Sequence, residues 1–133
     1  MRRSLAALTL VGILITTGCG SGGIDPALIS AAGDALSATR TAQLGVSLEA
    51  DGRMFPTSGS AVLHDMAEQL ADTAGELNVK QTSNEADAEY RARVLEATRA
   101  ALDAVHAAQQ GAGTASDALQ NAAESLADLK DQQ

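Results

Sequence analysis

Apolar residues recur along most of the chain with the spacing of an α-helix. Positions three and four residues apart share one face of a helix, because each residue turns the chain by about 100°. Four segments show such a stripe, at about residues 25–51, 60–77, 82–110 and 114–131. The clearest stripes are Leu63, Met66, Leu70, Ala74 and Leu77 in the second segment and Ala115, Leu119, Ala122, Leu126 and Leu129 in the fourth. The pattern predicts four amphipathic helices.

Residues that start and stop helices flank these segments. Asp25 can accept a hydrogen bond from the first helical turn, and Pro26 needs no donor there. Thr82 and Glu85 have the spacing of a capping box, which predicts the start of the third helix. Gly52 is expected to end the first helix in the left-handed conformation.

Opposite charges four residues apart are expected to support the third helix. Asp87 precedes Arg91 and Glu89 precedes Arg93 at this spacing. Each such pair stabilises a helix by only about 0.2–0.5 kcal/mol, so burial of the apolar stripes must provide most of the stability.

Short links between the four helices favour an all-α fold, an antiparallel up-and-down four-helix bundle. A competing pattern exists at residues 44–50, where apolar residues alternate as in a β-strand. A single strand would have no partner, so we favour helix there. Large core residues are few, and Leu70, Leu102 and Leu126 are expected to be buried. Phe55 is expected to close one end of the bundle.

The first 19 residues have the pattern of a secretory leader. Arg2 and Arg3 form a cationic start, an apolar run covers residues 5–15, and small residues precede Cys19. These are the three parts of a secretory signal. The apolar run is shorter than the roughly 20 residues that a spanning helix needs. We therefore expect a separate signal-peptide helix, followed by a flexible Gly/Ser tether.

The sequence Thr-Thr-Gly-Cys at residues 16–19 resembles the lipobox of bacterial lipoproteins, with Thr16 where Leu is usual. The resemblance covers only the leader. It implies cleavage before Cys19, a lipid on Cys19, and a protein held at the extracytoplasmic side of the cell membrane. Cys19 is also the single cysteine, so it has no partner for an internal disulfide. The alternative is an ordinary secretory leader with an incidental thiol.

Three parts of the chain follow from this interpretation. Residues 1–18 are the lipoprotein signal peptide, residues 19–24 are the lipidated cysteine with its flexible tether, and residues 25–131 are the helical bundle domain.

Composition limits the functions that the bundle can have. The formal net charge is −8, which disfavours nucleic acid and anionic lipid surfaces as partners. Alanine occurs 28 times, whereas Tyr90 and Phe55 are the only aromatic residues. Pockets for small molecules are commonly lined by aromatic side chains. The scarcity of aromatic residues in this chain therefore counts against such a pocket. In composition the mature part resembles small Ala-rich helical lipoproteins, most of them without an assigned function.

The chain has two histidines, His64 and His106, which are candidate metal ligands. Asp103 and His106 lie three residues apart, a spacing that places both on one helix face, and a bundle could bring His64 near them. Carboxylate-bridged di-iron bundles resemble this pattern but use two Glu-x-x-His motifs and two further glutamates. We therefore interpret both histidines as ordinary surface residues and expect no metal and no other cofactor.

The second helix carries an acidic face. Asp65, Glu68, Asp72 and Glu76 project opposite to its apolar stripe. One interpretation is a docking face for a basic partner or a weak site for divalent cations. The other, which we favour, is a solvated face or one that pairs with arginines of the third helix.

No nucleophile–base pair and no paired acid motif emerges, so we expect no enzyme. The sequence predicts a membrane-anchored extracytoplasmic lipoprotein, a non-enzymatic helical interaction or structural module of the cell envelope. Its expected partners are the membrane, through the lipid on Cys19, and another envelope protein. The alternative is a lipoprotein that binds a small ligand or a metal at an inter-helix site.

Overall fold

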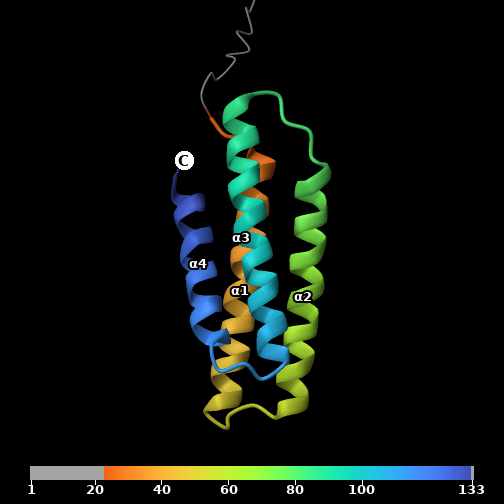
Figure 1. Cartoon of the computed structure of the whole chain (residues 1–133), viewed down its shortest axis with the longest axis vertical. Helices are drawn as coiled ribbons and strands as arrows, with labels where there is room; N and C mark the ends of the chain where they lie inside the picture. Colours follow the sequence, from red (N-terminus) through yellow and green to blue (C-terminus); the bar gives the residue numbers. More distant parts are fainter. Residues whose placement is uncertain (1–22, 133) are drawn as a thin grey trace, which may run out of the picture.

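The computed structural model describes residues 23–132, which form four α-helices and no strand (Figure 1). The helices are α1 (Pro26–Ala50), α2 (Pro56–Val79), α3 (Glu85–Gln109) and α4 (Ala115–Asp131). Successive helices run in opposite directions, so the predicted up-and-down four-helix bundle is confirmed. The predicted signal-peptide helix, Cys19 and most of the tether lie outside the described residues.

The two ends of the bundle differ in what they contain (Figure 1). The proximal end holds the start of α1, the connection between α2 and α3, and the end of α4. The distal end holds the connections between α1 and α2 and between α3 and α4. Each full-length helix of about 25 residues separates the two ends by about 37 Å, at 1.5 Å per residue.

The bundle is flattened along one diagonal. α3 packs against α1, while α2 and α4 lie on either side of this pair and, over residues 23–132, do not touch each other (Figure 1). Small side chains at buried positions of both central helices allow this approach. They are Ala32, Ala35, Ala38 and Ala42 in α1 and Ala97, Ala101 and Ala104 in α3.

The predicted apolar stripes form the core. All five stripe residues of α4 are buried, and in α2 the three leucines are buried while Met66 and Ala74 are half-buried. Leu70 and Leu126 are fully enclosed. Leu102, predicted to be equally buried, is only half-buried because it lies at the edge of the α3 stripe.

Several buried hydroxyl groups donate hydrogen bonds within a helix or between helices, whereas the buried Nε atom of Arg91 has no hydrogen-bond partner within residues 23–132. The hydroxyls of Thr39 and Thr98 donate to the carbonyl oxygens four residues before them. The Tyr90 hydroxyl donates to the carbonyl oxygen of Leu129 at 3.0 Å, which joins α3 to the last turn of α4. Burial raises the pKa of Tyr90, since the charged phenolate would lose its hydration.

The ends of α1 follow the prediction. Asp25 is the N-cap, and its side chain accepts a hydrogen bond from the backbone N–H of Ala27. Gly52 has a φ of +68°, the left-handed conformation expected after the helix. The stretch 44–50, which could also have been a strand, is helical.

Two predicted boundaries and one predicted contact are wrong. α2 begins at Pro56 rather than near residue 60, because proline is favoured at the first helical position. The N-cap of α3 is Asn84 rather than Thr82. Phe55 does not close the bundle: it is the N-cap of α2, its backbone is extended as expected before a proline, and 79% of it is exposed.

Candidate functional site

The acidic face of α2 is exposed as predicted. Asp65, Glu68, Asp72 and Glu76 all lie on the solvent side of the helix. Two arginines of α3 that could have formed ion pairs with this face, Arg91 and Arg93, form hydrogen bonds to other groups instead. Arg91 donates to the carbonyl oxygen of Lys80, and Arg93 donates to the side chain of Gln132.

Neutralising this face is expected to leave the fold intact. The variant Asp65→Asn/Glu68→Gln/Asp72→Asn/Glu76→Gln removes repulsion between like charges four residues apart, so its thermal midpoint should equal or slightly exceed that of the unchanged chain. Circular dichroism at 222 nm during heating measures this. A lower midpoint would show that the four carboxylates make stabilising contacts.

The candidate metal ligands do not form a site. His64, Asp103 and His106 are all exposed. The Nε2 atom of His64 lies 3.7 Å from Oε1 of Glu68, one helical turn further along α2. Over residues 23–132, no group of three or more His, Cys, Asp or Glu side chains is placed to hold a metal ion.

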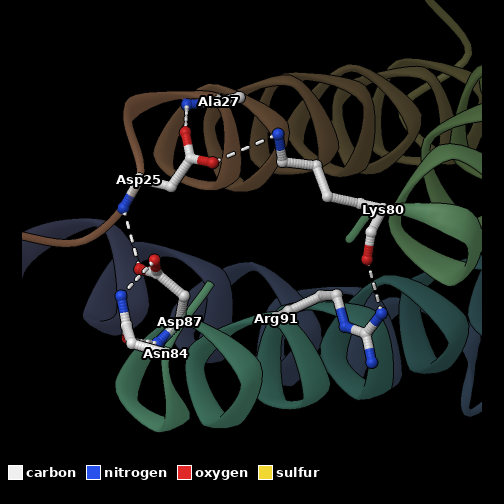
Figure 2. Close-up of polar contacts among 6 residues, drawn as sticks. All are labelled: Asp25, Ala27, Lys80, Asn84, Asp87 and Arg91. Carbon is white, nitrogen blue, oxygen red and sulfur yellow. Dashed lines mark hydrogen bonds and ion pairs between the residues drawn. The ribbon is translucent and has the colours of Figure 1, made fainter. Parts of the chain in front are cut away.

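A cluster of polar side chains, the proximal cluster, fastens the start of α1 to α2 and α3 (Figure 2). The backbone N–H of Asp25 donates to Oδ1 of Asp87 at 2.9 Å, and Oδ2 of Asp25 lies 3.1 Å from Nζ of Lys80. Asn84 donates to Asp87 at 2.8 Å through its side-chain amide. Arg91 donates to the carbonyl oxygen of Lys80 at 2.7 Å. The chain therefore enters the bundle at a point held by two other helices.

The Asp25 carboxylate is stabilised in its charged form within this cluster. The hydrogen bond from the Ala27 N–H lowers the pKa of Asp25 most, and Lys80 lowers it further. Asp87 is almost fully buried, and its carboxylate accepts from both Asn84 and the Asp25 backbone.

Sequence reasoning missed this cluster. Asp87 was predicted to pair with Arg91, yet its carboxylate accepts from Asn84 and from the Asp25 backbone instead. The signal was available locally, because Asn84 and Asp87 have the N-cap and N3 spacing of a reciprocal cap. The ion pair between Asp25 and Lys80 joins residues 55 positions apart, so no local pattern could predict it.

The distal end contains an open apolar groove of about 300 Å³, here named the distal groove. All four helices or their connections contribute to it. Its lining is Val46, Glu49, Ala50, Leu63, Ala108, Gly111, Ala112 and Ala115. Sequence reasoning expected Phe55 to fill this end of the bundle, whereas the space is open and Phe55 projects into solvent.

Glu49 is the one charged residue of the distal groove, and it is half-buried. Its carboxylate lies against Gly59 in the first turn of α2, where a Cβ atom would collide with it. α2 has no acidic residue in that turn and no side-chain cap. Glu49 thus places a negative charge near the positive N-terminus of α2.

Cys19, the predicted lipidation site, lies outside the described residues. Within residues 23–132, no helix has both the length and the apolar content of a membrane span. Comparisons of the chain with protein-family models, with curated proteins and with solved structures give no match.

Proposed function

We propose that this protein is a membrane-anchored extracytoplasmic lipoprotein whose helical bundle is a non-enzymatic structural or interaction module of the cell envelope. The observation that carries the proposal is the single cysteine, Cys19, which directly follows a cationic and apolar leader and a Thr-Thr-Gly sequence. A lipid on Cys19 would hold the chain to the membrane outside the cytoplasm.

The arrangement of the bundle suits such an anchor. Six residue steps separate Cys19 from Asp25, so the chain between them can span about 20 Å at most. The proximal cluster fixes Asp25 to α2 and α3. An anchor at Cys19 would therefore keep the proximal end near the bilayer and direct the distal end away from it.

Replacement of Cys19 by serine is expected to abolish membrane attachment or to leave the leader uncleaved. Two or more acyl chains hold a protein stably in a membrane. Serine cannot form the thioether that carries the lipid, so the variant would lack these chains. Fractionation of cells followed by mass spectrometry of the N-terminus measures both outcomes. Ser21→Ala, two residues away, is the matched control and should remain attached.

A Cys19→Ser protein that stays in the membrane fraction with its leader removed would contradict this proposal. Removal of the leader with retention at the membrane would show that some other part of the chain provides the attachment.

The alternative function is a lipoprotein that binds a small ligand. A groove of about 330 Å³ along α1 favours it, because Arg40 and Lys130 line this groove together with Leu36 and Leu44. Such a lining suits a small anion with an apolar part. A small molecule that remains bound to the purified protein would favour this alternative over the interaction module.

A further inference from the structure

We propose that the distal end of the bundle is a docking site for a basic, amphipathic segment of a second protein. An aliphatic side chain of that segment occupies the distal groove, and a neighbouring lysine or arginine lies beside Glu49. This inference rests on the proposed interaction module and names the chemistry of its partner.

One exposed aromatic residue lies at the distal end, whereas the other exposed large apolar residues, Leu44 and Val79, lie in α1 and at the end of α2. Phe55 is 79% exposed in the connection between α1 and α2, and the half-buried Met54 precedes it. The distal groove opens at the same end of the bundle. Aromatic residues and methionine are enriched in protein interfaces.

The size and lining of the distal groove select an aliphatic side chain. Its volume of about 300 Å³ is at the lower limit for small-molecule pockets, and most of its lining is alanine, valine and leucine. Amphipathic segments place aliphatic residues in such grooves at helical spacing.

The charges select a basic partner. Glu49 lines the groove and has no ion pair within residues 23–132. Basic residues are concentrated elsewhere: Lys80 and Arg91 belong to the proximal cluster, and Lys130 lies in the last turn of α4. Arg53 is the one basic residue of the connection that carries Phe55, next to the exposed Asp51. A cation on the partner would complement the half-buried carboxylate.

A second copy of this chain fits less well. Two distal ends would each bring Glu49 and Asp51 to the contact and only Arg53 as a counter-charge. Two proteins anchored in one membrane through Cys19 would also present their distal ends in parallel rather than facing each other. A different, basic protein would bring positive charges to Glu49 and Asp51, and it need not be anchored in parallel with this chain.

The test uses the full chain with Cys19→Ser, which keeps every bundle residue and removes the lipid. The probe is a synthetic 14-residue peptide of lysine and leucine with leucines at positions i, i+3, i+4 and i+7. Isothermal titration should show binding that weakens as salt rises, because the cations contribute. Methyl NMR signals of Val46 and Leu63 should shift on binding.

Two variants examine the two parts of the site. Ala112→Leu, at an exposed position on the rim, fills the distal groove and should weaken binding by about tenfold or more. Glu49→Gln should weaken it several-fold and reduce its salt dependence. Circular dichroism checks that both variants remain folded.

The matched control neutralises Asp65, Glu68, Asp72 and Glu76 on α2. This control removes more charge than Glu49→Gln but lies on another face, so it should change the affinity little. Peptides with glutamate for lysine, or with serine for leucine, should bind at least tenfold more weakly.

Three results would overturn the proposal: absence of peptide binding, equal binding by Ala112→Leu, or a larger loss with the α2 control than with Glu49→Gln. None of these results would affect attachment through Cys19, which the fractionation experiment measures separately.

Discussion

Replacement of Leu126 by alanine is expected to lower the free energy of unfolding by about 2–5 kcal/mol. Leu126 is fully enclosed in α4 and belongs to the main core. The substitution removes buried methyl groups and leaves a cavity that the surrounding helices fill only in part. The total free energy of unfolding of a native protein is about 5–15 kcal/mol, so this one side chain accounts for a large share of it. Urea unfolding followed by circular dichroism measures the loss.

Leu44→Ala is the matched control for this experiment. Leu44 lies in α1 with 58% of its surface exposed, so the same change should alter stability by about 0.5 kcal/mol or less. Leu102→Ala should fall between the two, since Leu102 is half-buried. If Leu126→Ala and Leu44→Ala lower stability equally, the core does not depend on its few large residues.

The helices and their buried faces could be predicted because both depend on local sequence. An apolar stripe such as Leu63–Leu77 determines which face of α2 is buried, whichever helix that face packs against. The same holds for the ends of α1, where Asp25 and Gly52 satisfy backbone geometry within a few residues. The four helices and both ends of α1 were confirmed, whereas the predicted starts of α2 and α3 and the full burial of Leu102 were wrong.

Features that depend on the meeting of distant segments could not be predicted. Phe55 was expected to close one end of the bundle, but it directly precedes Pro56 at the start of α2 and 79% of it is exposed. The ion pair between Asp25 and Lys80 exists only because the start of α1 lies beside the α2–α3 connection. Sequence periodicity gives the faces of helices and not their order around the bundle.

The candidate sites divide in the same way. Exposure of the α2 acidic face follows directly from helical spacing, and Glu68 is confirmed as exposed. The distal groove had no sequence signal, since Val46, Leu63 and Ala115 come from three helices. No sequence pattern distinguishes Glu49 from the other acidic residues. Only the structure shows that it lies beside Gly59 and lines the distal groove.

Replacement of Ala101 by leucine is expected to lower the free energy of unfolding by about 1–3 kcal/mol, even though it adds apolar surface. Ala101 is fully enclosed in α3, the helix that meets α1 across the short diagonal. Alanines at the buried positions of both helices permit that approach. Three added carbon atoms have no space there, so the helices must separate or the side chain must adopt a strained rotamer.

Ala100→Leu separates this packing effect from helix propensity. Ala100 is the neighbouring residue of α3 and is exposed, so the same substitution meets no opposing helix. Its propensity cost is a few tenths of a kcal/mol at most, because leucine is nearly as good a helix former as alanine. Urea unfolding of both variants gives the comparison. Similar stability for Ala101→Leu and Ala100→Leu would mean that the two central helices have room for a leucine between them. A loss confined to Ala101→Leu would show that the small side chains determine how closely α1 and α3 approach.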